Sequence, residues 1–287
     1  MKIQIVNYEM GSNNGILSKY SNKLNDELKK LGQDSRVYNV PSRDVTVNYH
    51  INYLPYKHEN SPDTINALMI THIFENYKLS AIRKGMETAD IGICMSSETM
   101  EKLIDWGIPK EKLTTILPAH DGHVRRHQIV SILTNVYPDG CKREEMFTEL
   151  VKTLDKNKWA FRIMGSGWHE ILVPLVAEGL QVDYFAEFNY DIHKQILESS
   201  DYSLYFGKDE GSMGILDSAN AGVKTITTNQ GFHKDIGIDY PFDTQQELND
   251  IFAKLSVNKV EDWTWKNYAI NHLKLFESIN ASPKNGE

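Results

Sequence analysis

Residues 201–227, the most informative stretch of the sequence, read DYSLYFGKDEGSMGILDSANAGVKTIT. An apolar run at 203–206 precedes an acidic loop that contains glycine, and a helical pattern then begins near Met213 and continues to Gly222. A second apolar run follows at 223–227. Strand, loop, helix and strand in this order predict a parallel βαβ unit, in which ligands bind beside the carboxyl ends of the strands.

The same alternation of short apolar runs and amphipathic segments extends along the rest of the chain. We expect further strands at residues 3–6, 36–40, 67–70, 91–95, 113–117, 128–133, 160–164 and 182–185, and an extended piece within 45–56. A polar segment at 118–127 lacks periodicity and is typical of a link between domains. The pattern predicts an α/β protein with two Rossmann-like domains, residues 1–124 and 125–262, followed by a C-terminal helix and tail at 263–287.

The composition is that of a globular protein and excludes several functional classes. Of 287 residues, 40% are hydrophobic and 24% are charged, and the net charge of −8 provides no broad cationic surface for nucleic acid. The two cysteines, Cys94 and Cys141, form neither a disulfide framework nor a zinc motif. The N-terminal apolar run is too short for a signal peptide, and no stretch approaches the length of a membrane-spanning helix. We therefore expect a cytoplasmic protein without a transmembrane segment or a nucleic-acid partner.

Three features of residues 201–227 suit a phosphorylated sugar. The backbone N–H groups of residues 212–214, where the helix begins, can receive a phosphate without a basic side chain. Asp217 lies about one turn into the helix, where its carboxylate can accept hydrogen bonds from the two vicinal hydroxyls of a ribose. Asp209 or Glu210, in the loop, can bind a sugar hydroxyl.

The segment also resembles the donor-binding signature of GT-B glycosyltransferases, in particular the large retaining, GT4-like group called glycosyl transferases group 1. Aligning residues 221–223, Ala-Gly-Val, with the small-Gly-small step of that family places Asp209 and Asp217 at its two acidic positions. Both are Asp where Glu is usual, so Glu210 is the alternative to Asp209. The resemblance implies two Rossmann-like domains that face each other across a cleft, with the C-terminal helix packing back toward the first domain.

Motifs elsewhere in the second half follow the order of the same family. The Gly-Ser-Gly at 165–167 resembles its turn at the nucleotide, and Phe188 ends a segment that resembles the turn beside the base. The family places an Arg and a Lys on the donor diphosphate after the strand at 128–133. Lys142 matches the Lys, with Arg143 as the competing choice, whereas Asn135 stands near the position of the Arg.

Two motifs of the first half complete the resemblance. Gly11 and Ser12 belong to a segment that resembles the glycine-rich loop facing the cleft, and His72 matches a histidine near the reacting sugar. The resemblance thus implies catalytic roles for His72, Asp209 and Glu210, and donor-binding roles for Gly11, Ser12, Lys142, Arg143, Gly165, Ser166, Gly167, Phe188, Ser212, Met213, Gly214 and Asp217.

The function that this resemblance implies is transfer of a hexosyl group from a nucleotide-sugar, such as a UDP-sugar, to an acceptor. The expected mechanism is retaining and metal-independent, with the nucleotide-sugar as co-substrate and no cofactor. The histidines at 120, 123 and 127 lie near Asp121, but their spacing suits no metal site. A carbohydrate, a lipid-linked molecule, a small molecule and a protein all stay open as the acceptor, as does the oligomeric state. The alternatives are a nucleotide-sugar epimerase of the same fold and a non-catalytic sugar-binding relative.

Overall fold

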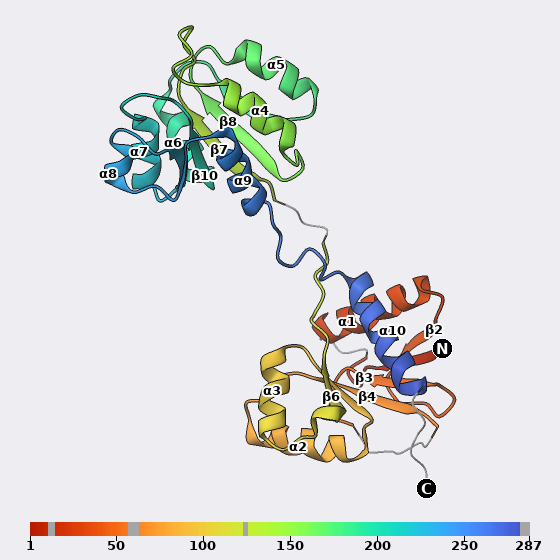
Figure 1. The fold of residues 1–287 in the computed structure, drawn as a ribbon. Helices are drawn as coiled ribbons and strands as arrows, with labels where there is room; N and C mark the ends of the chain where they lie inside the picture. Colours follow the sequence, from red (N-terminus) through yellow and green to blue (C-terminus); the bar gives the residue numbers. More distant parts are fainter. Residues whose placement is uncertain (11–14, 57–62, 123–125, 282–287) are drawn as a thin grey trace. The chain divides into compact units, whose positions relative to one another are not determined.

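The computed structural model describes residues 1–10, 15–56, 63–122 and 126–281. It divides into two compact units, of which the first comprises residues 1–123 with 259–287 and the second comprises residues 124–258. Each unit contains one parallel sheet of six strands (Figure 1). The predicted two-domain α/β fold with two Rossmann-like sheets is therefore confirmed. The boundaries of the compact units differ from the expected ones by one residue at the first crossing and by four at the second.

The first unit is built on a sheet with the strand order β2-β1-β3-β4-β5-β6. Its strands are β1 (Lys2–Val6), β2 (Asp34–Tyr38), β3 (Val47–His50), β4 (Ile65–Ile70), β5 (Ile91–Cys94) and β6 (Leu113–Thr115). Its helices are α1 (Gly15–Lys30), α2 (Asn76–Thr88), α3 (Ser97–Asp105), the short 3-10 helix η1 (Lys110–Lys112) and α10 (Trp265–Ala281). This is a flavodoxin-like order, whose switch point lies between β1 and β3.

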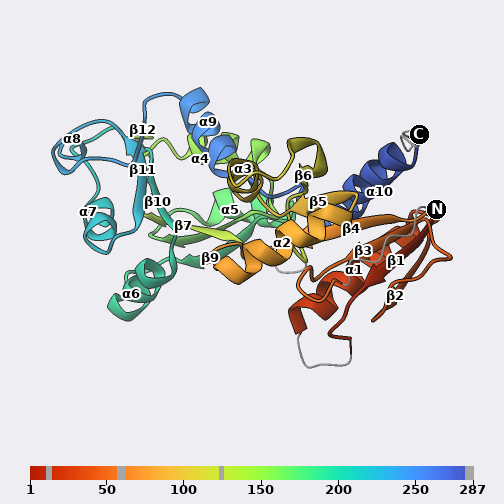
Figure 2. The ribbon, with the colours of Figure 1, turned by 90° about the horizontal axis from the view of Figure 1, so that it is seen from below.

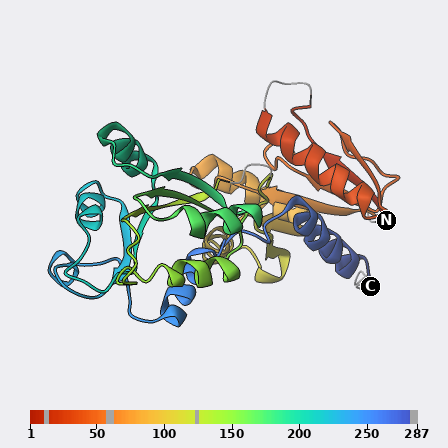
Figure 3. The same cartoon turned by 90° about the horizontal axis from the view of Figure 1, so that it is seen from above.

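Two separate hydrophobic cores cover the faces of this sheet. The α1 and α10 helices pack on one face, and the α2 and α3 helices pack on the other (Figures 2 and 3). Trp265, Tyr268 and Phe276 of α10 are buried against the strands. Burial of aromatic side chains of this size contributes about 2–3 kcal/mol each. The prediction that the C-terminal helix packs back onto the first domain is confirmed.

The connection from β2 to β3 contains no helix, which shortens the first unit. Residues 39–46 pass over the sheet and are held by a reciprocal pair of bonds, in which the Ser42 N–H donates to Asn48 Oδ1 (2.9 Å) and Asn48 Nδ2 donates to the Ser42 carbonyl (2.8 Å). Gln4 Nε2 similarly donates to the Val40 carbonyl at 2.5 Å. Buried polar side chains on the strands thus satisfy the backbone of this connection. Only Val47–His50 of the expected extended piece is a strand.

The second unit has the strand order β12-β11-β10-β7-β8-β9, which is the order of a dinucleotide-binding Rossmann sheet. Its strands are β7 (Gln128–Leu133), β8 (Trp159–Met164), β9 (Gln181–Phe185), β10 (Tyr202–Tyr205), β11 (Lys224–Thr228) and β12 (Tyr240–Phe242). Its helices are α4 (Glu145–Thr153), α5 (His169–Ala177), α6 (Tyr190–Ser199), α7 (Met213–Asn220), α8 (His233–Ile236) and α9 (Gln245–Leu255). The α4, α5 and α9 helices share one core, and α6 and α7 lie against the other face (Figure 1).

The two chain segments that lead out of the first unit are joined to each other by hydrogen bonds of residues 120 and 121, which belong to the predicted link. His120 Nε2 lies 2.8 Å from the Val260 carbonyl, and the His120 N–H donates to the Trp263 carbonyl at 2.8 Å. Asp121 accepts a hydrogen bond from Trp265 Nε1 at 2.9 Å. These two residues therefore fasten the start of α10 to the end of the first crossing. Within the described residues, no helix combines the length and the hydrophobicity that spanning a bilayer requires.

Candidate functional site

The candidate site of the second unit lies where the strand order reverses, between β7 and β10. The chain moves from β7 outward to β8 and β9, and then returns to the other side of β7 through β10. The connections after β7 and β10 therefore leave the sheet on opposite faces, and ligands of open α/β sheets bind at the carboxyl ends of such a pair of strands. Most of the residues predicted to bind the donor follow β7, β8 or β10 and thus share this edge.

Lys142, Tyr205 and Asp209 form a hydrogen-bonded cluster at this edge. The Lys142 ammonium is ion-paired with the Asp209 carboxylate and donates to the Tyr205 hydroxyl at 2.9 Å. The Tyr205 hydroxyl in turn donates to the Asp209 carboxylate at 2.6 Å, and the Gly211 N–H donates to the same carboxylate at 3.0 Å. The Lys142 and Asp209 side chains are only 15% and 29% exposed. Two residues predicted for different parts of the donor are therefore in direct contact.

The surroundings of this cluster fix its charges at neutral pH. Burial raises the pKa of Asp209, but hydrogen bonds from Lys142, Tyr205 and the Gly211 N–H outweigh burial, so the pKa lies below its usual value. Burial lowers the pKa of Lys142, yet the bonds to Asp209 and Tyr205 raise it above its usual value. Burial and the Asp209 carboxylate raise the pKa of Tyr205 to about 12. The cluster therefore consists of an ammonium, a carboxylate and a neutral phenol.

Arg143, the competing choice for the diphosphate, has a different set of partners. Its Nε donates to the Phe206 carbonyl at 2.6 Å, and its Nη1 donates to the Asp243 carbonyl at 3.4 Å. The residue has a φ of 50°, in the left-handed region that non-glycine residues rarely adopt. The guanidinium thus braces the end of β10 against the loop after β12. Of the two basic residues, Lys142 is the one that joins the acidic loop.

The α7 helix begins directly beside the end of β7. A Cβ added to Gly214 would lie 2.6 Å from Leu133 Cβ, so only glycine permits this approach. The first turn of α7 contains no acidic residue, and the Ser212 side chain makes no capping hydrogen bond. The positive end of the helix is therefore directed at the edge of the sheet where an anion would be stabilised. Met213, at the first helical position, is 65% exposed.

A buried histidine that the sequence analysis missed holds the start of α7 in place. His233 Nε2 accepts a hydrogen bond from the Ser212 N–H at 2.9 Å, and its Nδ1 lies 3.1 Å from the Thr228 carbonyl. Because Nε2 is an acceptor, the ring is neutral and carries its proton on Nδ1. Burial lowers the pKa of His233, which agrees with the neutral form. No local sequence pattern points to this residue, since it lies 21 residues after the amide that it binds.

The Gly-Ser-Gly turn after β8 packs closely on the loop after β7. A Cβ on Gly165 would lie 2.1 Å from the Thr134 carbonyl oxygen, and one on Gly167 would lie 2.8 Å from the Val136 carbonyl oxygen. The Ser166 N–H donates to Asn135 Oδ1 at 2.8 Å. Asn135, which stands near the position of the family arginine, is therefore used to join the two loops. Only glycine at these two positions permits so close an approach of the two backbones.

Phe188 and Asp217, predicted for the base and the ribose, are linked through His193 of α6. The Phe188 and His193 rings have centroids 5.5 Å apart, and His193 Nε2 lies 3.7 Å from Asp217 Oδ2. Phe188 is 65% exposed, and the Asp217 side chain is 51% exposed. An exposed aromatic ring and an exposed carboxylate therefore lie on either side of one histidine, which the sequence analysis did not single out. Glu210 is also exposed, in the loop that carries Asp209.

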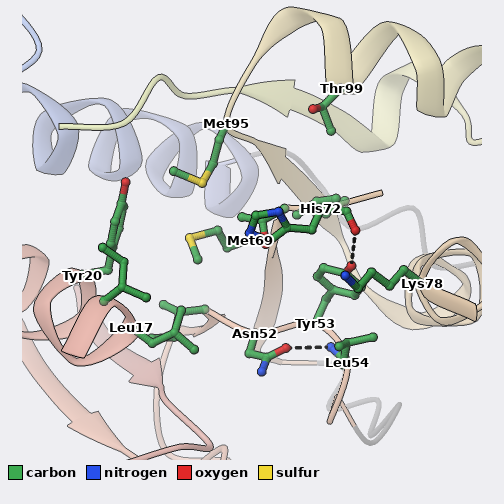
Figure 4. Close-up of a pocket in the computed structure, with 14 residues that line it drawn as sticks. Leu17, Tyr20, Asn52, Tyr53, Leu54, Met69, His72, Lys78, Met95 and Thr99 are labelled. Atoms are coloured by element: carbon green, nitrogen blue, oxygen red, sulfur yellow. Dashed lines mark hydrogen bonds between the residues drawn. The ribbon is translucent and has the colours of Figure 1, made fainter. Parts of the chain in front are cut away.

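The remaining predicted residues belong to the first unit. Gly11 and Ser12 lie outside the described residues. His72 follows β4 with a φ of 53°, and its carbonyl accepts a hydrogen bond from the Tyr53 hydroxyl at 3.1 Å (Figure 4). It lines a cavity of about 520 Å³ within that unit. Across the described residues, no group of three or more His, Cys, Asp or Glu side chains is arranged to hold a metal ion.

No family model and no curated protein matches the sequence. Among solved structures, the chain is similar to TarM of S. aureus in complex with Fondaparinux, alpha-GlcNAc-glycerol and UDP, with 12% identity, 88% of this chain covered and a TM-score of 0.39. It spans only 58% of the TarM chain. It is also similar to Anabaena HepE in complex with UDP and glucose (13% identity, 98% and 97% of the two chains, TM-score 0.39). A third similar structure is the lipopolysaccharide outer core galactosyltransferase WaaB in its apo form (12% identity, 97% and 100%, TM-score 0.37). Structural similarities with TM-scores below 0.5 do not assign a function to this chain.

Proposed function

We propose that the protein is a glycosyltransferase that moves a hexosyl group from a nucleotide-sugar to an acceptor, with the donor held by the second unit. The observation that carries the proposal is that Lys142 is ion-paired with Asp209, in the loop that leads into α7, at the switch point of a Rossmann sheet. A cation and the N-terminus of a helix at that edge suit a diphosphate. The order of sequence motifs that resemble the GT-B donor site supports the same assignment.

Lys142 has capacity for a further ligand. An ammonium group has three N–H donors, and Tyr205 and Asp209 take two of them within the described structure. The third can donate to a phosphate oxygen. Together with the amides at the start of α7, it would stabilise the negative charge that develops on the leaving diphosphate. Because these groups can stabilise the leaving diphosphate without a metal ion, we propose a metal-independent transfer, and the resemblance to the retaining GT4-like group supports a retaining one.

The same geometry supports an assignment of residues to the base, the ribose and the sugar of the donor. The exposed Phe188 ring offers a stacking surface for the base, and Asp217 offers a carboxylate for the ribose hydroxyls. Because both oxygens of Asp209 are occupied by the cluster, the exposed Glu210 is the better placed of the two to bind a sugar hydroxyl. Asp209 acts instead through Lys142, whose position and charge it controls. His72 remains the proposed residue beside the reacting sugar on the acceptor side.

The proposal is tested by calorimetric titration with UDP-, GDP-, ADP- and dTDP-sugars. We expect one of them to bind, Lys142→Ala and Asp217→Ala to weaken binding, and Lys152→Ala, an exposed lysine of α4, to leave it unchanged. Absence of binding by every nucleotide-sugar would refute the proposal. Analysis of products with and without acceptors distinguishes the alternatives, because an epimerase alters the donor sugar unaided and a non-catalytic relative alters nothing.

A further inference from the structure

The cavity of the first unit opens at the carboxyl ends of β3, β4 and β5, where parallel sheets bind ligands. Its wall is mostly hydrocarbon, aromatic ring and thioether, and includes Leu17, Tyr20, Tyr53, Met69 and Met95 (Figure 4). The volume of about 520 Å³ lies in the range of sites for small organic molecules. The cavity is therefore large enough for an aromatic or alkyl group and apolar enough to favour one.

Several polar side chains in the wall already have partners within the protein. Asn52 donates to Glu9 Oε1 at 3.0 Å and accepts from the Leu54 N–H at 3.1 Å. The Thr99 hydroxyl accepts from Ser96 Oγ at 2.9 Å, and Lys78 is ion-paired with Glu75. A sugar presents many hydroxyls, and each one buried without a partner weakens binding by about tenfold. This wall is consequently a poor match for a sugar.

The end of β4 contributes two polar residues to the wall. Thr71 and His72 line the cavity there, and His72 is held in its left-handed conformation by the hydrogen bond from Tyr53 (Figure 4). Polar side chains at this point of a mostly apolar wall suit a ligand that carries only one or two hydroxyls. Such a molecule would place its body against Leu17, Met69 and Met95 and direct its hydroxyl to His72.

We propose that the cavity binds the apolar body of the acceptor, and that this acceptor is an alcohol or phenol carried on an aromatic or alkyl group. The proposal rests on the glycosyl transfer proposed above and specifies its acceptor class. In that reaction the bond from the anomeric carbon to the phosphate oxygen breaks and a bond to the acceptor oxygen forms. The acceptor proton passes to the leaving diphosphate. A free aromatic alcohol and a lipid-borne alcohol share this chemistry.

The test is titration of the full chain with 2-naphthol, with the ten-carbon alcohol geraniol and with methyl glucoside, monitored by calorimetry without donor. Binding of 2-naphthol or geraniol, but not of methyl glucoside, is the expected result. Preference for 2-naphthol indicates a free aromatic acceptor, and preference for geraniol indicates a lipid-borne one. Met95→Trp, which fills the cavity, and Leu17→Asn, which places an amide in its wall, should each weaken binding about tenfold or more.

Controls separate this inference from the proposed function. Val176→Asn replaces a half-exposed apolar residue on α5 of the other unit and should not alter binding of the alcohols. Thermal unfolding of Met95→Trp and Leu17→Asn shows whether the first unit, which contains both substitutions, is folded, and the nucleotide-sugar titration reports on the second unit. Binding of a nucleotide-sugar without either alcohol, or binding of methyl glucoside that Met95→Trp abolishes, would overturn the acceptor proposal. Binding of the alcohols without any nucleotide-sugar would overturn the glycosyl transfer and leave an apolar site of another function.

Discussion

The Asp209→Asn substitution tests whether the Asp209 carboxylate and a bound diphosphate compete for the Lys142 ammonium. In the structure, the ammonium is already ion-paired with the Asp209 carboxylate, which Tyr205 and the Gly211 N–H hold in place. Asparagine has nearly the same size but carries no charge, and its one carbonyl oxygen can still accept two of these hydrogen bonds. The substitution therefore removes repulsion between Asp209 and an incoming phosphate while it retains most of the geometry. We expect a nucleoside diphosphate to bind the variant more tightly.

The magnitude follows from the charges and their exposure. A phosphate oxygen bonded to Lys142 would lie roughly 5 Å from the Asp209 carboxylate, where two unit charges repel by about 3 kcal/mol at an effective dielectric constant of ~20 and by less than ~1 kcal/mol in bulk water. Since Asp209 is 29% exposed, solvent screens part of this repulsion. An intermediate value of about 1.4 kcal/mol corresponds to roughly tenfold tighter binding.

The assay is calorimetric titration of wild type and Asp209→Asn with the nucleoside diphosphate of the preferred donor, at low and high salt. The difference between the two proteins should shrink at high salt, because screening weakens the removed repulsion. Asp183→Asn is the matched control, since Asp183 pairs with Arg162 at 3.4 Å on the β8–β9 face of the same unit and should not affect affinity. Weaker binding by Asp209→Asn, with the same thermal stability, would refute competition and show that the carboxylate only positions Lys142.

Three further predictions concern the fold that carries the site. Among the described residues, the buried Nε2 of His272 has no hydrogen-bond partner, and burial lowers the pKa of His272 to about 4. The contribution of His272 to stability is therefore complete above pH 6.5 and falls by roughly 2–3 kcal/mol by pH 4.5. His272→Leu should reduce the loss of stability at acid pH in thermal unfolding, and an unchanged pH profile would contradict this. Gly165→Ala should lower the free energy of unfolding of the second unit, measured in urea, by more than about 2 kcal/mol, because the added Cβ would collide with Thr134. Gly179 also has a positive φ but lies in open space, so Gly179→Ala should lower it by only about 1 kcal/mol. Equal decreases would exclude the close approach to Thr134 as the cause. Phe276→Ala should destabilise the first unit by about 3–5 kcal/mol, and a change below 1 kcal/mol would show that α10 is not part of that core.

Much of the fold is predictable because its strands are apolar on both faces. Runs such as 67–70 and 91–94 are buried throughout, and an uninterrupted apolar run bounded by polar segments is a strong strand signal. The sequence is less informative where polar residues are buried. In β3, Asn48 and His50 lie inside the protein because neighbouring loops and side chains satisfy them, so periodicity alone did not delimit this strand. The three-residue β12 was missed because it is too short for any pattern.

The candidate site was predictable only where a motif is local. The acidic loop and the helix start were found because they are adjacent in sequence, and the βαβ pattern places both at one edge of the sheet. Tyr205, His193 and His233 were not singled out, because each acts through a partner that tertiary structure brings near. Lys142 and Asp209 lie 67 residues apart, and no pattern in the sequence indicates that they form an ion pair.

The most direct test of the central claim is a crystal structure of the protein with the nucleoside diphosphate of its preferred donor. We expect the diphosphate within hydrogen-bonding distance of Lys142 Nζ and of the amides of residues 213–214, with the ribose at Asp217. A nucleotide bound elsewhere, with Lys142 still paired only with Tyr205 and Asp209, would contradict this claim.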